Sequence, residues 1–243
     1  MRKCALITGA SGGIGSAIAL RLAKDGFDIA ACYYSDENGI SKLEEELALS
    51  GVDYRIYKAD VSDMNSIKKI FADATEVFGG VSVLVNNAGM AQQKLFTDIT
   101  EAEFDRITDV NFKGVFNCCQ CAVPYMVSRK SGKIINISSM WGVCGASCET
   151  VYSATKAAVI GLTKALAREL APSNVQVNCV APGAIDTKMN SNLSDADKKA
   201  FAEEIPMGRF GTPEEIAGVV SFLAGRDSDY VTAQVITADG GLT

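Results

Sequence analysis

Histidine is missing from this chain of 243 residues. Without an imidazole, the Ser-His-Asp and Cys-His arrangements of hydrolases are excluded. Acid–base chemistry then falls to tyrosine, lysine, aspartate or glutamate. The cysteines at positions 118, 119 and 121 have neither a histidine nor a second ligand pair at suitable spacing, so we expect no metal site.

Long hydrophobic runs and a regular cysteine framework are also lacking. No apolar run approaches the ~20 residues of a membrane span, and the apolar part of the N-terminus is too short for a secretory signal. The eight cysteines show no disulfide pattern, so we expect reduced, mostly buried thiols and a cytoplasmic protein. Positive charge is scarce: the formal net charge of -6 argues against a nucleic-acid-binding surface.

Short apolar runs alternate with amphipathic helical stretches from end to end. Most of the expected strands are short continuous apolar runs rather than alternating ones, typical of a parallel sheet covered on both faces. They span residues 4–8, 28–33, 53–58, 82–86, 133–138, 176–181 and 234–237. The expected helices span residues 14–24, 39–50, 64–78, 101–128, 151–171 and 213–224. This order predicts an α/β fold with a doubly wound parallel sheet of seven strands, a Rossmann-type single domain over residues 1–243.

A glycine-rich loop joins the first expected strand to the first helix, and it reads Thr8-Gly9-Ala10-Ser11-Gly12-Gly13-Ile14-Gly15. Glycines permit a tight turn there and let backbone N–H groups approach a pyrophosphate at the helix N-terminus. The same glycines could serve only close packing of helix on strand. Their place after a buried strand and before a helix favours dinucleotide binding.

A second pattern is Tyr152-Ser153-Ala154-Thr155-Lys156, near the start of the helix expected over 151–171. Four residues are just over one helical turn, so Tyr152 and Lys156 share a face. A free phenol has a pKa of ~10, and a fixed ammonium nearby would lower it toward neutrality and make the phenol a better proton shuttle. Plain solvated helix faces show the same spacing, so this pair needs support from the rest of the chain.

That support comes from motifs in a fixed order along the chain. Asn86-Asn87-Ala88-Gly89 follows the fourth strand, Ser139 the fifth, and Pro182-Gly183 the sixth. Together with Thr8-Gly-x3-Gly-x-Gly and Tyr152-x3-Lys156, this set resembles the short-chain dehydrogenase/reductase family over essentially the whole chain. Residues 208–217 and 238–241 resemble the bacterial 3-oxoacyl-[acyl-carrier-protein] reductases within that family.

The resemblance implies reduction of a ketone to a secondary alcohol with NAD(P)H. Asn86, Ala88 and Gly89 would hold the end of the fourth strand against the cofactor ribose, and Asp60 would accept from the adenine amine. From the residues alone, Asp60 in a surface turn is the less favoured alternative. The cofactor-binding residues implied in this way are Gly9, Ser11, Gly12, Gly13, Ile14, Gly15, Tyr34, Ser35, Asp60, Val61, Asn87, Ala88, Gly89, Tyr152, Lys156, Pro182, Gly183, Ile185 and Thr187.

The resemblance also implies four catalytic residues: Asn111, Ser139, Tyr152 and Lys156. The family places its catalytic hydroxyl thirteen residues before the tyrosine, which selects Ser139 over Ser138. Ser139 would hold the substrate oxygen while Tyr152 donates the proton. Lys156 would lower the pKa of the phenol and bind the nicotinamide ribose, and Asn111 would sustain a proton relay through water. Residues 184–207, with Lys188, Met189, Asn190 and Leu193, would form a mobile substrate lid.

Two departures from the family pattern bear on the cofactor. Many NADPH-dependent relatives carry an arginine where this chain has Gly12. NAD-dependent relatives usually carry an aspartate at the end of the second strand, where this chain reads Cys32-Tyr33-Tyr34-Ser35 and Asp36 comes late. Because that aspartate would repel a 2′-phosphate, its absence favours NADP(H) over NAD(H).

Partners can be expected from charge and from apolar helix faces. An acidic acyl carrier protein needs a basic patch, which Arg129, Lys130 and Lys133 could supply. Cations there could instead serve only the end of a helix, and the second basic contact typical of such reductases is Ser173 here. The helices over 101–128 and 151–171 are apolar on more than one face, which favours a homotetramer.

Two other functions stay open. One is a short-chain dehydrogenase acting on a free sugar, steroid or small alcohol. The other is a non-catalytic NAD(P)-binding regulator, against which the intact catalytic set argues.

Overall fold

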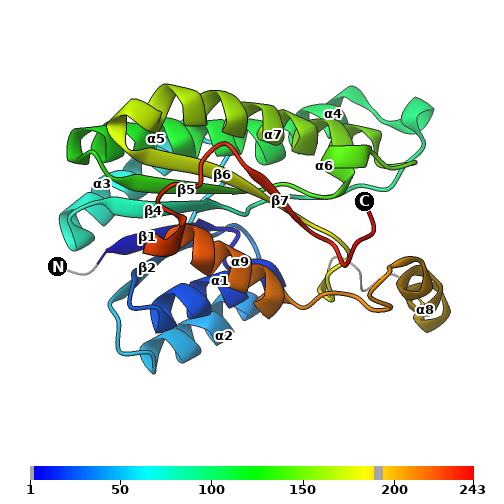
Figure 1. The fold of residues 1–243 in the computed structure, drawn as a ribbon, viewed down its shortest axis with the longest axis horizontal. Coiled ribbons are helices and arrows are strands. Elements are labelled where there is room, and N and C mark those ends of the chain that lie inside the picture. The colour runs from blue at the N-terminus through cyan, green and yellow to red at the C-terminus, as the bar shows by residue number, and fades with distance from the viewer. Residues whose placement is uncertain (1–2, 189–193) are drawn as a thin grey trace.

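Seven parallel strands form one sheet in the order β3-β2-β1-β4-β5-β6-β7, with helices on both faces (Figure 1). The computed structural model describes residues 3–188 and 194–243. The strands are β1 (Cys4–Thr8), β2 (Asp28–Tyr33), β3 (Tyr54–Lys58), β4 (Val81–Asn86), β5 (Gly132–Ile137), β6 (Val175–Pro182) and β7 (Val235–Ala238). The α/β doubly wound fold predicted from the alternating apolar runs is therefore confirmed.

Two apolar layers cover the sheet, one on each face. The helices of one layer are α1 (Gly13–Lys24), α2 (Glu37–Ala48) and α9 (Pro213–Ala224). Those of the other are α3 (Met64–Phe78), α4 (Glu101–Thr108), α5 (Gly114–Arg129) and α7 (Thr150–Leu170). The five inner strands β2, β1, β4, β5 and β6 are almost wholly buried, which explains their largely apolar sequences.

The structure differs from the sequence expectation between residues 101 and 129. One helix was expected, but the helical ladder is interrupted by a π-helical turn at Asp109–Lys113. Asn111 lies in this turn with no exposed surface, and its side chain bonds to the backbone of Met90. A buried side chain held by a neighbouring segment accounts for the local change of winding.

Two short helices were not expected from the sequence. They are α6 (Trp141–Cys144), which follows β5, and α8 (Asp195–Glu204), which precedes α9. Helix α6 is a single turn, and α8 has no apolar stripe at helical spacing, so neither carries a periodic signal.

All seven strands run the same way, so their carboxyl ends share one edge of the sheet. The glycine-rich loop follows β1, Asn87 follows β4, Ser139 follows β5 and Gly183 follows β6. The motifs are thus gathered at the edge where ligands of such sheets bind. Helix α7 runs back over the sheet and brings Tyr152 and Lys156 to the same edge.

Candidate active site

The side chains of Thr8 and Asn87 connect the glycine-rich loop to the end of β4. The Thr8 hydroxyl accepts hydrogen bonds from the backbone N–H groups of Asn87 and Ala88, each at 3.0 Å. The Asn87 side-chain amide donates to the carbonyls of Thr8 and Gly9, at 3.0 and 3.1 Å. Asn87 thus uses its donors to hold two loops together, and Thr8, which the sequence analysis did not select, shares this positioning role.

The same loop has two glycines that close backbone contacts require and two others that are exposed. Gly9 has a φ of 65°, and a Cβ there would lie 2.9 Å from the Ala88 Cα. A Cβ on Gly15 would overlap the Gly9 carbonyl oxygen. Gly12 and Gly13 are exposed instead, and no side chain caps the N-terminus of α1. The uncapped N–H groups at this helix end fit the pyrophosphate of a dinucleotide.

Asp60 and Tyr34, two of the residues implied in cofactor binding, contact Arg106, which the sequence motifs did not indicate. The Asp60 carboxylate accepts from the Arg106 guanidinium at 2.7 Å and from the Ser62 N–H at 2.9 Å. The same guanidinium lies 5.4 Å from the ring centre of Tyr34, which is exposed. Val61 is buried against Gly114. Arg106 thus connects the ends of β2 and β3 across the outer part of the site.

Asp36 is engaged by two partners at the start of α2. Its carboxylate caps the helix by accepting from the Gly39 N–H at 2.9 Å, and it pairs with the Lys188 ammonium at 2.9 Å. The hydrogen bond from Lys188 is the main cause that lowers the pKa of Asp36. This carboxylate is therefore partly neutralised by its neighbours.

Ser139 and Tyr152 meet at the carboxyl edge, and both are buried. The Ser139 hydroxyl lies within hydrogen-bonding reach of the phenol, and it accepts from the Trp141 N–H at 3.2 Å. Burial raises the pKa of Tyr152, while the Ser139 hydrogen bond lowers it and the nearby charge of Glu149 raises it. The direction is opposite to the one expected from the sequence, because burial, the largest cause, outweighs the contribution of Ser139.

That ammonium belongs to Lys156, which is only 4% exposed. Its Nζ lies 5.7 Å from the ring centre of Tyr152 and donates to the Ile137 carbonyl at 2.9 Å. Burial lowers the pKa of Lys156 to about 8. A Cβ on Gly89 would lie 3.2 Å from Nζ, so the amine also faces the end of β4.

Asn111 connects the same loop after β4 to the catalytic helix. Its Oδ1 accepts from the Met90 N–H at 2.9 Å, and its Nδ2 donates to the Met90 carbonyl at 2.9 Å and to the Thr155 hydroxyl at 3.2 Å. A Cβ on Gly89 would lie 3.4 Å from Oδ1, so Asn111 and Lys156 converge on one point. The structure thus places all four residues of the implied catalytic set at this edge.

Two further residues hold the catalytic lysine in place. The Ser138 hydroxyl donates to the Lys156 carbonyl at 2.8 Å, so this serine fixes the backbone of the catalytic helix. In α6, a Cβ on Gly142 would lie 2.8 Å from the Lys156 Cβ. Sequence reasoning missed Gly142, since nothing local shows that α6 packs on α7.

The side chain of Asn86 does not point where the sequence analysis expected. Its side chain is buried under the sheet, where Nδ2 donates to Asn136 Oδ1 at 2.8 Å and to Cys119 Sγ at 3.4 Å. It was expected to hold the strand end against the ribose, but strand alternation turns it into the core while Asn87 faces the loop.

The segment after β6 closes the other side of the site. The Pro182 carbonyl accepts from the Met140 N–H at 2.9 Å, and a Cβ on Gly183 would lie 2.6 Å from the Asp239 Cα. Ile185 pairs with Gly211, and Thr187 lies against Gly13 of the glycine-rich loop. Of the expected lid, residues 184–188 and 194–207 are described, while Met189, Asn190 and Leu193 lie outside the described residues.

Lys133 does not belong to the basic surface patch that was expected from the sequence. It lies in β5 and is buried, and its ammonium bonds to the Ser228 hydroxyl at 2.8 Å and to Asp229 at 2.8 Å. It therefore fixes the turn after α9 and offers no surface charge. Arg129 and Lys130 remain exposed at the end of α5.

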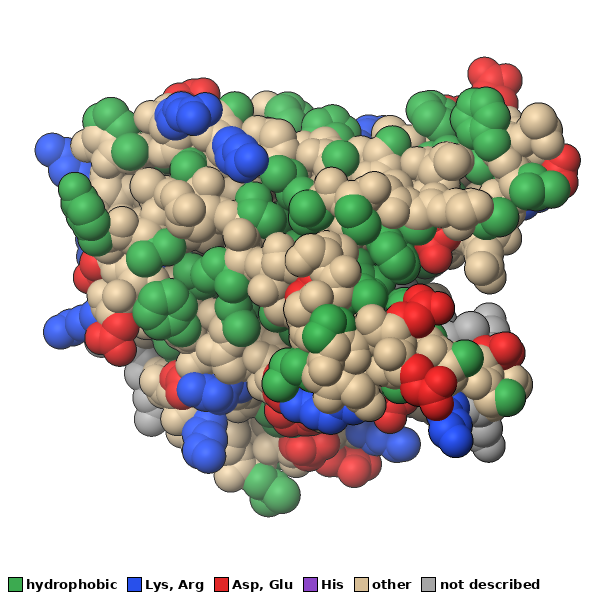
Figure 2. Space-filling view, turned by 45° about the vertical axis from the view of Figure 1, so that its right-hand side comes forward, with side chains coloured by type: hydrophobic (Ala, Val, Ile, Leu, Met, Phe, Trp, Pro, Cys, Tyr) green, Lys and Arg blue, Asp and Glu red, His purple; other side chains and the backbone are tan. Residues whose placement is uncertain are grey.

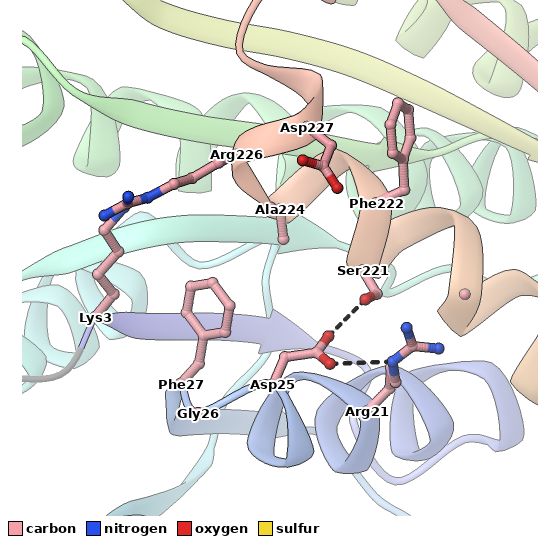
Figure 3. A pocket seen from close by; sticks show the side chains of 12 residues that line it. Lys3, Arg21, Asp25, Gly26, Phe27, Ser221, Phe222, Ala224, Arg226 and Asp227 are labelled. Atoms are coloured by element: carbon pink, nitrogen blue, oxygen red, sulfur yellow. Dashed lines mark hydrogen bonds and ion pairs between the residues drawn. The ribbon is translucent and has the colours of Figure 1, made fainter.

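Two hollows mark opposite edges of the molecule. At the carboxyl edge, the surface is recessed between the lobe that carries α4 and the lobe that carries α8 (Figure 2). A hollow of about 560 Å³ at the amino edge lies between α1, β1 and α9, where Asp25 pairs with Arg21 and Ser221 (Figure 3). The second hollow is remote from Tyr152 and Ser139, so it is not the reaction site.

The cysteines and helices agree with the absences noted in the sequence. All eight cysteines are free thiols. Among the residues that the structure describes, no helix combines the length and apolar character of a bilayer span.

A glycine-rich loop after β1 and a Ser139–Tyr152–Lys156 group at the sheet edge define an NAD(P)-dependent oxidoreductase. A family model described as Enoyl-(Acyl carrier protein) reductase matches residues 9–243. The chain belongs to the short-chain dehydrogenase/reductase family.

Particular relatives are similar over the full chain. The 3-oxoacyl-[acyl-carrier-protein] reductase FabG of Staphylococcus aureus is 44% identical over 100% of this chain and 98% of its own. The FabG of Thermotoga maritima is 45% identical over 99% of this chain and 97% of its own. The crystal structure of a short-chain type dehydrogenase/reductase from Mycobacterium marinum is 38% identical, with a TM-score of 0.93, and the match covers 99% of this chain and 95% of that one.

Proposed function

We propose that this chain reduces the 3-keto group of an acyl thioester to a secondary alcohol with NADPH, as a cytoplasmic 3-oxoacyl-[acyl-carrier-protein] reductase of fatty-acid synthesis. The observation that carries the proposal is the placement of two buried hydroxyls, those of Ser139 and Tyr152, next to each other and beside the Lys156 ammonium. Full-length similarity to two 3-oxoacyl-[acyl-carrier-protein] reductases supports the substrate class.

The two hydroxyls suit a ketone oxygen that gains negative charge. When bound, the nicotinamide supplies hydride to the carbonyl carbon. Ser139 then donates a hydrogen bond to the developing alkoxide, and the Tyr152 phenol transfers its proton to that oxygen. Lys156 stabilises the phenolate by its charge, and the neutral alcohol leaves.

Recovery of the phenol proton is the role proposed for Asn111. Its side chain clamps Met90 and Thr155, and its Oδ1 and the Lys156 ammonium face the same point near Gly89. A water held there would return a proton to the lysine and so to the phenol. The lid proposed over residues 184–207 would exclude bulk water during this step.

Cofactor binding is proposed along the carboxyl edge. The pyrophosphate would lie on the N–H groups of Gly12 to Gly15, and the adenine near Asp60. Tyr34 and Ser35 would face the 2′-phosphate of NADPH. The partly neutralised carboxylate of Asp36 supports NADPH over NADH, because Lys188 and the Gly39 N–H already offset its charge.

The cofactor preference can be tested at Gly12. A Cβ there would meet only the Gly9 carbonyl oxygen, at 3.6 Å, so a side chain can be accommodated. We expect Gly12→Arg to raise the preference for NADPH over NADH by about tenfold, since a charge-assisted hydrogen bond contributes about 1.5–3 kcal/mol. kcat/KM for both cofactors measures the effect, and a parent enzyme that strongly prefers NADH would contradict the proposal.

Carrier-protein docking is proposed at Arg129 and Lys130. Both side chains are exposed at the C-terminal end of α5. They lie at the amino edge, about 20 Å along β5 from the reaction centre. Charge reversal of both should raise KM for a carrier-bound thioester while leaving KM for a free thioester nearly unchanged.

A substrate panel tests the proposed function itself. Acyl-carrier thioesters, free ketones, sugars and steroids are compared with NADPH and NADH. The highest kcat/KM is expected for 3-oxoacyl thioesters. A sugar or steroid substrate with higher kcat/KM would instead assign the chain to another branch of the family.

A further inference from the structure

Glu149 is an acidic residue next to the reaction centre that the proposed mechanism does not use. It precedes the first residue of α7, and its carbonyl accepts from the Ser153 N–H at 2.8 Å, so it belongs to the first turn. Residues three apart on a helix are neighbours on one face, which places Glu149 beside Tyr152. Its carboxylate is close enough for its charge to raise the pKa of the phenol.

No protein group neutralises this carboxylate in the described part of the chain. No hydrogen bond or ion pair to the Glu149 side chain is found among residues 3–188 and 194–243. The nearby segment does carry a cation, since the Lys94 N–H donates to the Cys148 carbonyl at 2.7 Å. The Lys94 ammonium, however, bonds to both carboxylate oxygens of Glu103 at 2.9 Å.

Partial burial strengthens the repulsion between the Glu149 carboxylate and any anion placed beside it. Glu149 is partly buried, and desolvation raises its pKa. A partly desolvated charge is weakly screened, so a like charge brought beside it is repelled more strongly than on an open surface. Two acidic groups in one small site are mutually unfavourable.

We propose that Glu149 excludes ketones that carry a carboxylate next to the reacting carbonyl, so that the site accepts 3-oxoacyl groups only as neutral thioesters or esters. This inference rests on the proposed function, because the reacting oxygen is placed at Ser139 and Tyr152. In a 3-oxo acid the carboxylate is two bonds from the keto carbon and would enter the region beside Glu149. Esterification removes that charge and leaves the reacting carbonyl unchanged.

The test compares acetoacetate with methyl acetoacetate, which differ in that charge. We measure kcat/KM for each at fixed neutral pH and low ionic strength, with NADPH, for the parent, Glu149→Gln and Glu149→Lys. The ester-to-acid ratio should fall at least about tenfold in Glu149→Gln, mainly through KM for the acid, and further in Glu149→Lys. A tenfold change corresponds to about 1.4 kcal/mol.

Glu169→Gln provides the matched control, because it removes the same charge from an exposed position at the far end of α7. Its ratio should equal that of the parent. An ester-to-acid ratio that stays within about twofold in Glu149→Gln overturns the inference, as does a parent that reduces both compounds equally well.

A binding readout separates this inference from the proposed function. Calorimetry compares 3-hydroxybutyrate with its methyl ester, each added to enzyme saturated with the oxidised cofactor. If no ketone is reduced, the proposed function fails, yet tighter binding of the acid to Glu149→Gln still supports the role of Glu149. Equal affinities of parent and Glu149→Gln for the acid overturn it.

Discussion

The Lys156 ammonium is buried away from water, and its desolvation lowers the free energy of unfolding. Burial lowers the pKa of Lys156 from 10.5 to about 8. Between these values the unfolded chain retains a proton that the folded chain has released. Stability attributable to Lys156 therefore rises with pH across this window, and below it the full cost of the buried charge remains.

Lys156→Met tests this linkage. At neutral pH, replacing the ammonium relieves desolvation, although the bond to the Ile137 carbonyl is lost. From about pH 8 to about pH 10.5, the stability of the parent should gain on the variant by up to about 1.4 kcal/mol per pH unit. Urea denaturation at several pH values measures the difference. A difference that does not change with pH would show that the lysine is not held charged in a dry site.

Tyr152→Phe separates proton transfer from binding. The phenol oxygen is the proposed donor, and the ring keeps its packing after the change. Turnover should fall at least about 100-fold, as expected for loss of an acid–base group. Cofactor affinity, followed by fluorescence titration, should stay within a few-fold of the parent. Residual turnover close to the parent would rule out the phenol as the donor.

Among the elements, the loop between β1 and α1 requires glycine at position 15 but not at position 12. Gly15→Ala places a Cβ on the Gly9 carbonyl oxygen, which is backbone and cannot rotate away. We expect a loss of about 1–3 kcal/mol in the free energy of unfolding and weaker cofactor binding. Gly12→Ala is the matched control, because its Cβ has ordinary contact at 3.6 Å and should cost less than about 1 kcal/mol. Equal effects of the two changes would contradict the steric argument.

The strands could be predicted from the sequence, whereas the π-helical turn could not. The strands were predictable because most are short apolar runs between helices, and the seven expected segments match β1 to β7 within a residue or two. The π-helical turn was not predictable, because it depends on the contact of Asn111 with Met90, 21 residues earlier. Asn111 itself was selected only through the family resemblance.

Side-chain direction was the least predictable part of the site. Asn86 and Asn87 are adjacent, yet one bonds to Asn136 in the core and the other to Thr8 in the loop. Lys133 looked like surface charge because it follows Arg129 and Lys130. Its burial depends on Ser228 and Asp229, almost a hundred residues later, and no local pattern reports that contact.

For the whole molecule, the homotetramer expected from the sequence would rest on apolar surface of α4, α5 and α7. Phe116 on α5 is 45% exposed, and Phe104 on α4 is 49% exposed. On α7, Gly161 is exposed, and a Cβ there would meet nothing within 4 Å, so a second helix could approach closely. Exposed apolar side chains on neighbouring helices are typical of interfaces.

Phe116→Asp should therefore dissociate the assembly. The parent is expected to have the mass of four copies of the 25.7 kDa chain by light scattering, and the variant a smaller one. Glu169→Gln, an exposed change at the end of α7, should leave the mass unchanged. A parent that is monomeric at all concentrations would contradict the proposal.

The parallel sheet also separates the two ends of the chain (Figure 1). Lys3 enters β1 at the amino edge, beside the hollow of Figure 3. Thr243 ends at the carboxyl edge, where its N–H and hydroxyl both bond to Asp239, and the Asp239 backbone packs against Gly183. A purification tag or fluorescent fusion added after Thr243 would emerge beside the proposed nicotinamide site and compete with substrate for space. The same addition placed before Lys3 would emerge at the opposite edge, which makes the N-terminus the end to extend in any assay of activity.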